Sequence, residues 1–155
     1  MSEKIPVSEI MTRELLVVEE SENLHAVAKD MKRGHFRHLP VIDGVFGEGG
    51  RLVGLLGHRN LRDVRDDRTK TSVGMVMTKD VKTVQPNTPV FEAVQTMLAE
   101  QVGCLPVVDD EGVLLGIVSE VDLLKLLSGL LNLGEHTYDS AEASFHRTPT
   151  LVPTR

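Results

Sequence analysis

The pentapeptide Leu39-Pro40-Val41-Ile42-Asp43 returns as Leu105-Pro106-Val107-Val108-Asp109, and Ile10-Met11-Thr12 returns as Val76-Met77-Thr78. Both recurrences are 66 residues apart, and no gap is needed between them. A constant offset over this length of chain indicates two copies of one structural unit rather than a chance recurrence of short apolar segments. Two such copies are expected to face each other across a pseudo-twofold axis, and the cleft between them is the natural place for function.

The offset changes after Asp43. Residues 54–61 match residues 116–123 at an offset of 62, so the four extra residues of the first copy lie in the glycine-rich stretch 44–50. Apolar runs flank this stretch on both sides, which is typical of a hairpin turn, where insertions are tolerated. A phosphate-binding loop is disfavoured, because no Gly-Lys-Ser/Thr follows the glycines and no helix is expected to begin there.

The composition argues against several classes of protein. A net charge of −6 is unfavourable for a nucleic-acid binder, which needs clustered Lys and Arg. Cys104 is the only cysteine, so an intramolecular disulfide is impossible and a reducing compartment fits. The N-terminus does not resemble a signal peptide, and no apolar run approaches the ~20 residues of a membrane span. We therefore predict a cytoplasmic protein with no nucleic-acid and no membrane partner.

Each copy is predicted to run strand, helix, strand, strand, helix. The expected strands of the first copy cover residues 15–18, 38–42 and 52–56, and its helices cover residues 24–34 and about 60–67, with a cap at Ser21-Glu22-Asn23. In the second copy, a strand over 81–84 and a helix near 90–101 precede two strands and a helix over about 120–131. We assign residues 5–68 to the first copy, 73–131 to the second, and 132–155 to a polar C-terminal tail.

The final helix carries more apolar residues than one buried stripe of ~100° needs. The residues concerned are Val121, Leu123, Leu124, Leu126, Leu127, Leu130 and Leu131. One face can serve the core of this chain, and the rest is expected to meet a second chain, which predicts a homodimer through the helices. The alternative is that all of these leucines belong to the core.

Four segments of the sequence resemble a tandem CBS-domain pair, or Bateman module. They are Val7-Ser8-Glu9-Ile10-Met11-Thr12, His38-Leu39-Pro40-Val41-Ile42-Asp43, Thr83-Val84-Gln85-Pro86-Asn87-Thr88-Pro89-Val90-Phe91-Glu92-Ala93 and Leu115-Gly116-Ile117-Val118-Ser119-Glu120-Val121-Asp122-Leu123. The resemblance covers about residues 5–131. It implies an α+β fold in which two CBS units pack through their sheets. It also implies two clefts that bind adenosine-type ligands such as AMP, ADP, ATP, NAD or S-adenosylmethionine.

Ser119-x-x-Asp122 lies where a strand gives way to a helix. A carboxylate there can accept hydrogen bonds from both ribose hydroxyls, and the Ser119 hydroxyl is available to a ligand oxygen. Spacing alone favours the alternative that Asp122 stabilises the first turn of the helix, whereas the resemblance favours a ribose contact. The matching positions of the first copy are Gly57 and Asn60, which lack the hydroxyl and the charge. The Asp122 cleft is therefore expected to be the better nucleoside site.

The resemblance also assigns the phosphate and adenine contacts. Arg37 and His38 occupy the position that supplies basic residues to phosphate groups, and His58 and Arg59 form a second possible basic pair. A flat apolar slot for adenine would be formed by Met11, Leu16, Ile117 and Val118 at the Asp122 cleft, and by Met77, Val81 and Lys82 at the Asn60 cleft. The alternatives are solvated arginines and ordinary core packing.

Two functions remain open from the sequence. The first is a stand-alone regulatory module that senses an adenosine-containing ligand and acts on a separate effector protein. The second is a structural dimerisation module without a nucleotide. No nucleophile, general base or cofactor loop is found, so we do not predict an enzyme or a cofactor. A metal site from His35, His38 and His58 is disfavoured, because no cysteine or acidic ligand stands at metal-binding spacing.

Overall fold

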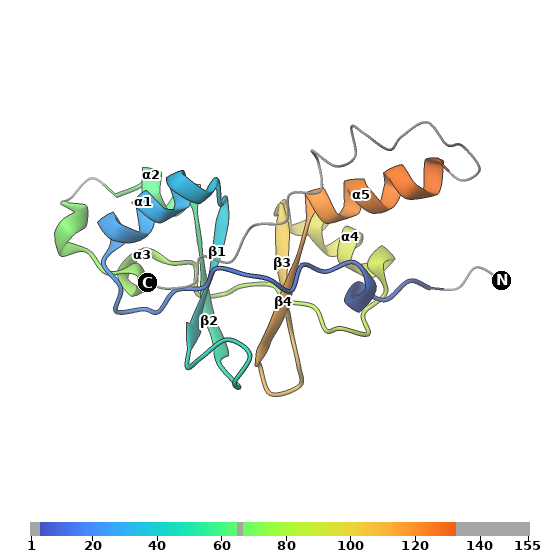
Figure 1. Ribbon diagram of the computed structural model, residues 1–155, viewed down its shortest axis with the longest axis horizontal. Coiled ribbons are helices and arrows are strands. Elements are labelled where there is room, and N and C mark those ends of the chain that lie inside the picture. The colour runs from blue at the N-terminus through green and yellow to red at the C-terminus, as the bar shows by residue number, and fades with distance from the viewer. Residues whose placement is uncertain (1–3, 65–66, 133–155) are drawn as a thin grey trace.

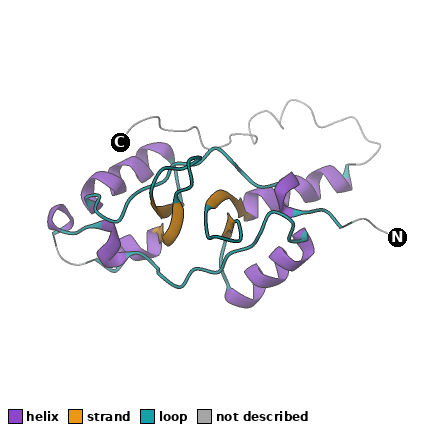
Figure 2. Ribbon diagram, turned by 90° about the horizontal axis from the view of Figure 1, so that it is seen from below, coloured by secondary structure: helices purple, strands orange, loops and turns teal. Residues whose placement is uncertain are grey.

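Each copy of the repeat folds as one antiparallel β-hairpin with helices on its outer side. The computed structural model describes residues 4–64 and 67–132. The two hairpins lie side by side in the middle of the molecule, and the helices of the two copies lie at opposite ends (Figures 1 and 2). The elements of the first copy are η1 Val7–Glu9, α1 Leu24–Gly34, β1 His38–Asp43, β2 Arg51–Gly57 and α2 His58–Arg62. Those that follow are η2 Arg68–Lys70, α3 Val73–Val76, α4 Val90–Glu100, β3 Cys104–Val108, β4 Leu114–Ser119 and α5 Glu120–Leu131.

The first strand predicted for each copy is wrong, because residues 15–18 and 81–84 make only single bridges. Val18 bridges Val41 in parallel, and its N–H donates to the carbonyl of Pro40 at 3.0 Å. The next step of a parallel ladder would need an N–H from residue 40, which proline lacks. Pro106 stops the ladder beside Val84 in the same way. The prolines of the repeated Leu-Pro-Val segments therefore limit the pairing of residues 15–18 and 81–84 to one bridge each.

The predicted helices are otherwise close to those observed. Asn23 caps α1, its side chain accepting a hydrogen bond from the N–H of Ala26, and α5 has the predicted bounds. The helix expected over about 60–67 is wrong in extent, because α2 ends at Arg62. Apart from Asn132, the predicted tail lies outside the described residues.

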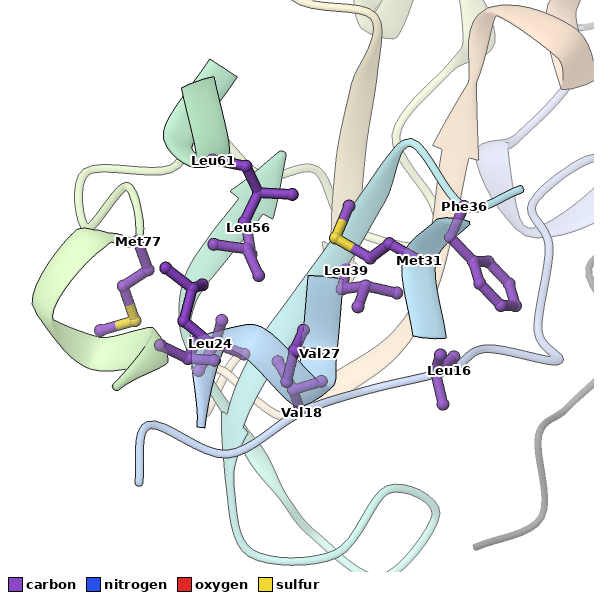
Figure 3. Packing of buried hydrophobic residues seen from close by; sticks show 12 residues of the cluster. Leu16, Val18, Leu24, Val27, Met31, Phe36, Leu39, Leu56, Leu61 and Met77 are labelled. Atoms are coloured by element: carbon purple, nitrogen blue, oxygen red, sulfur yellow. The ribbon is translucent and has the colours of Figure 1, made fainter. Parts of the chain in front are cut away.

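The N-terminal segment of each copy packs on the other copy. Val7 and Met11 are buried in the second copy's cluster with Ala93 and Met97, whereas Met77 is buried in that of the first. Figure 3 shows Met77 reaching into this cluster beside Leu24 and Leu56. Each core therefore needs a segment from the other copy.

Matched backbone hydrogen bonds hold the exchanged segments in place. The Val7 N–H donates to the Thr88 carbonyl at 2.8 Å, and the Val73 N–H donates to that of Glu22 at 2.9 Å. These two bonds are related by the 66-residue offset at both ends, since 73 − 7 and 88 − 22 are equal. The exchange is therefore a property of the repeat.

The two hairpins also contact each other directly, which confirms that the copies pack through their sheets. A cluster between them holds Ile42 of β1, Val108 of β3 and Leu114 of β4. Two hydrogen bonds of 3.0 Å join the hairpins, from the N–H of Leu52 to the Gly112 carbonyl and from the N–H of Leu114 to the Gly50 carbonyl. This apolar contact holds the two copies together at their hairpins.

Candidate functional site

Asp122 lies in the first turn of α5 and is the one charged residue that is buried among the described residues, with 7% of its surface exposed. One carboxylate oxygen, Oδ2, accepts hydrogen bonds from the backbone N–H of Ser119 at 2.8 Å and from the Ser119 hydroxyl at 3.1 Å. The other, Oδ1, accepts one from the hydroxyl of Thr12 at 2.9 Å. Asp122 therefore caps α5 and also joins the N-terminal segment of the first copy to the second.

Asn60 occupies the matching place in the first copy. Its Oδ1 accepts a hydrogen bond from the N–H of Gly57 at 2.8 Å, as Asp122 does from that of Ser119. Its Nδ2 donates to the carbonyl of Val76 at 2.9 Å and to the hydroxyl of Thr78 at 3.3 Å. The two sites share one geometry and differ in charge, because Asn60 is neutral. The amide nitrogen of Asn60 uses its N–H groups to hold the exchanged segment.

Thr12 and Thr78 are partners in these sites that the sequence analysis did not assign. Both follow the repeated methionine, Met11 or Met77, and are therefore related by the same offset of 66 residues. The backbones at these threonines pair with the hairpins: the N–H of Thr12 donates to the Ile117 carbonyl at 2.8 Å, and that of Thr78 to the Leu55 carbonyl at 2.9 Å. The recurrence of threonine directly after this methionine in both copies is the feature of the sequence that could have predicted these two partners.

A shallow cleft of about 190 Å³ lies between β2 and the segment after Thr78. It is lined by Leu52, Val53, Gly54, Lys79, Val81, Thr83, Val108 and Gly112. Of the residues assigned to the Asn60 cleft, Val81 is part of this lining. Pockets for drug-sized ligands are about 300–1,000 Å³, so a whole nucleotide needs a wider opening than this cleft provides.

Most of the residues assigned to an adenine slot are core residues in this structure. Leu16 is 5% exposed and Val118 is fully buried, while Met11 and Met77 are 8% exposed each. Leu16 belongs to the core cluster of the first copy, beside Val18 and Phe36 (Figure 3). Their apolar side chains fill the interior instead of lining an open slot, because burial removes them from water. Ile117 is only partly buried, beside the cluster between the hairpins.

The basic residues gather where the hairpins meet the helices. Arg37, His58 and Arg59 are exposed, and His38 is partly buried opposite Gly57. Burial lowers the pKa of His38 below its ordinary value, and the charges of Arg37 and His58 lower this pKa further. Glu120 of the second copy opposes these effects by raising the pKa of His38. His38 therefore interacts electrostatically both with basic residues of its own copy and with Glu120 at the start of α5.

The lowered pKa of His38 predicts a pH dependence of stability. Its folded pKa lies below that of the unfolded chain, so the unfolded state binds more protons as the pH falls through 6.5. The free energy of unfolding should therefore fall between pH 7.5 and 5.5, and His38→Gln should flatten part of this fall. Urea unfolding at each pH measures it, with His25→Gln on the exposed face of α1 as the control for losing one histidine. An unchanged slope in His38→Gln would contradict the prediction.

Lys82 and Cys104 are two further candidates from the sequence. Lys82 makes an exposed ion pair with Glu100 at 4.0 Å, and pairs of this kind contribute little stability. Burial raises the pKa of the Cys104 thiol to about 12, so the thiolate needed for nucleophilic attack does not form near neutral pH.

No three His, Cys, Asp or Glu side chains in residues 4–64 and 67–132 are grouped to hold a metal ion. In the same part of the chain, no helix has the length and apolar character to cross a bilayer.

The family model for the CBS domain matches this chain twice, over residues 7–67 and 73–129. The chain belongs to the CBS-domain family. A CBS domain-containing protein of Dictyostelium discoideum is 30% identical over 141 residues, covering 83% of this chain and 94% of that protein. The inosine-5'-monophosphate dehydrogenase of Methanocaldococcus jannaschii is 33% identical over 117 residues, which are 76% of this chain but 22% of that enzyme. The chain thus spans less than a quarter of the enzyme's length.

Solved structures of CBS pairs share the fold. CBSX2 in complex with AMP superposes with a TM-score of 0.73 at 25% identity, covering 81% of this chain and 98% of CBSX2. A CBS domain pair in complex with 5'-methylthioadenosine and S-adenosyl-L-methionine gives a TM-score of 0.71 at 25% identity, covering 83% of this chain and 99% of that pair. The tandem CBS pair and the α+β fold predicted from the sequence are thereby confirmed.

Proposed function

We propose that this CBS pair is a regulatory module that senses an adenosine-containing ligand between its two copies, with the Asp122 cleft as the principal site. The observation that carries the proposal is a buried carboxylate placed where the two copies meet. Its Oδ1 accepts one hydrogen bond from the protein, which leaves a lone pair for a ribose hydroxyl. The CBS pairs solved with AMP and with S-adenosyl-L-methionine support this class of ligand.

Each part of the ligand has a proposed partner. Asp122 and Ser119 would hold the ribose diol, and Arg37 and His38 would face the phosphates or another charged group. Met11 and Ile117 would contact the base once the cleft has widened. The Asn60 cleft, with Gly57, His58 and Arg59, would bind more weakly, because a neutral amide makes weaker hydrogen bonds than a carboxylate.

The hydrogen bond between Thr12 and Asp122 suggests how binding could become a signal. A ribose hydroxyl at Oδ1 would share this oxygen with the Thr12 hydroxyl and weaken the Thr12 hydrogen bond, which holds the exchanged segment against the second copy. Loosening this segment would change the angle between the copies and move the helices α2 and α5. A ligand shifts such an equilibrium only by its difference in affinity for the two shapes. Solution scattering with and without AMP measures the shape change, and identical profiles would leave a passive binder.

A thermal-shift series with AMP, ADP, ATP, NAD and S-adenosylmethionine tests the proposed function. A ligand at about 100 times its dissociation constant should stabilise the protein by about 2.7 kcal/mol. For a chain of this size that raises the midpoint of thermal unfolding by roughly 5–10 °C. The mass of any small molecule released on denaturing the purified protein identifies a ligand carried from the cell. No shift with any of the five compounds would contradict the proposal.

The second candidate is a structural dimerisation module whose clefts hold no nucleotide. The observation that favours it is that groups of the protein itself already hydrogen-bond both carboxylate oxygens of Asp122 and the amide of Asn60. On this alternative the two side chains only cap helices and join the copies. The thermal-shift series separates the two candidates. In both, we propose a cytoplasmic protein, and the sensing module would act on a separate effector protein.

A further inference from the structure

The shallow cleft beside β2 has a counterpart on the other side of the contact between the hairpins, and that counterpart is filled. The offsets of 66 and 62 residues match Val81 of the cleft with Leu15, and Leu52 of the cleft with Leu114. Leu15 and Leu114 are 6% and 1% exposed, whereas Val81 and Leu52 are only partly buried. The contact between the hairpins is therefore open to solvent on one side and closed on the other.

The closed side packs around the apolar residues between the hairpins, which we call the hairpin cluster. Its buried members are Leu15, Ile42, Val108 and Leu114, and the partly buried Val17, Phe46, Leu52 and Ile117 pack against it. Phe46 comes from the turn 44–50, which holds the four extra residues of the first copy. The shorter turn of the second copy offers Gly112 to the shallow cleft instead, and glycine has no side chain to fill it. The longer turn thus adds an aromatic ring on one side only.

The turn that carries Phe46 has a defined conformation. The Val45 carbonyl accepts hydrogen bonds from the N–H groups of Glu48 and Gly50, both at 3.0 Å. Gly47, which follows Phe46, has a φ of +86°, in the left-handed region that favours glycine. The turns of both hairpins lie at the same end of the hairpins, away from α2 and α5 (Figure 1). This conformation leaves Val45 57% exposed while its neighbour Phe46 packs against the hairpin cluster.

We infer that Phe46 holds the Asp122 cleft closed, so that the base of a ligand reaches Ile117 only after the ring of Phe46 has left the hairpin cluster. The inference rests on the proposed function, which assigns Ile117 to the base. Ile117 and Val17 both pack against the cluster that Phe46 closes. When only a fraction of the molecules is open, the apparent affinity is reduced by that fraction. Phe46 is therefore a competitor of the ligand built into the chain.

Phe46→Ala separates this competition from ordinary core packing. Loss of a packing residue should lower both the thermal midpoint and the ligand affinity, whereas loss of a competitor should lower the midpoint and raise the affinity. Isothermal titrations with AMP, ADP, ATP, NAD and S-adenosylmethionine should show at least about fivefold tighter binding to Phe46→Ala of each compound that the wild type binds. Val45→Ala, in the same turn but on its exposed side, should bind as the wild type does.

Thiol labelling tests the closure without a ligand. Val17→Cys places a thiol beside the hairpin cluster, and Thr83→Cys places one at the matching position in the open shallow cleft. With N-ethylmaleimide, the thiol of Val17→Cys should react at least about fivefold faster when Phe46→Ala is added, because the open fraction rises. The thiol of Thr83→Cys should react fast with or without Phe46→Ala. The native Cys104 is buried and adds little background.

Unchanged labelling of Val17→Cys in a folded Phe46→Ala protein would overturn the inference. Faster labelling together with unchanged or weaker ligand affinity would overturn it as well. Failure of the proposed function looks different, because neither protein would then bind any of the five compounds, while faster labelling would still support closure by Phe46. Phe46→Leu keeps the apolar contact but lacks the ring. It replaces Phe46→Ala in both measurements, with smaller changes in the same directions, should circular dichroism show that the alanine variant is unfolded.

Discussion

Gly116→Val is expected to lower the free energy of unfolding by about 2–3 kcal/mol, the cost of overpacking a well-filled interior. Gly116 lies in β4, where the exchanged segment of the first copy runs against the strand. A Cβ at this position would stand 2.7 Å from the carbonyl oxygen of Thr12 and 3.2 Å from the sulfur of Met11. The backbone of Thr12 is held there by two hydrogen bonds to Ile117, so it cannot yield without losing them. Equilibrium unfolding in urea measures the loss.

Gly129→Ala provides the control for Gly116→Val. Gly129 lies in α5, and apart from its chain neighbours and the nearby backbone of the helix no atom of the described residues stands within 4 Å of a Cβ built there. Alanine is favoured over glycine inside a helix by roughly 1 kcal/mol, so this variant should be slightly more stable than the wild type. If Gly116→Val were as stable as the wild type, the first copy's segment could not lie against β4 as the structure has it.

The repeat in the sequence predicts the units of the fold but not how they exchange segments. The match of Met11 with Met77 shows that each copy has the same short apolar segment near its start. The apolar pattern is satisfied equally by packing on the chain's own copy or on the other one. The choice depends on the length and path of residues 12–18 and 78–84, which run past the hairpins, and such a path leaves no periodic signal. The sequence therefore predicts the elements and leaves their exchange open.

The candidate site was predictable in part for a similar reason. The Ser119-x-x-Asp122 motif lies at the predicted junction of strand and helix, because a strand followed by a capped helix has a recognisable pattern. Leu16 and Val118 were assigned to a ligand slot, whereas the structure buries them in the cores. An apolar residue next to a cleft and one beneath it have the same sequence signature. Only the packing of the exchanged segments separates the two cases.

Asp122→Asn is expected to weaken adenosine-ligand binding by at least about 10-fold, because a hydrogen bond to a charged acceptor contributes about 1.5–3 kcal/mol. The fold should hold, since Asn60 shows that an amide fits the same geometry. The new amide can accept from the N–H of Ser119 and donate to the hydroxyl of Thr12 and the carbonyl of Ile10, the counterpart of the Val76 carbonyl that Asn60 bonds. Isothermal titration with the ligand found in the thermal-shift series measures the affinity.

The variant separates the two roles that the structure allows for Asp122. Asp122→Ala would remove a helix cap and a bond between the copies together with any ribose contact, so its lost affinity could follow from lost stability. Asp122→Asn keeps the cap and removes mainly the charge. Asn60→Asp, the reverse change in the first copy, should leave affinity at the Asp122 cleft intact. Unchanged ligand affinity in a folded Asp122→Asn protein would limit Asp122 to capping α5 and joining the copies, because the carboxylate would then have no part in holding the ribose.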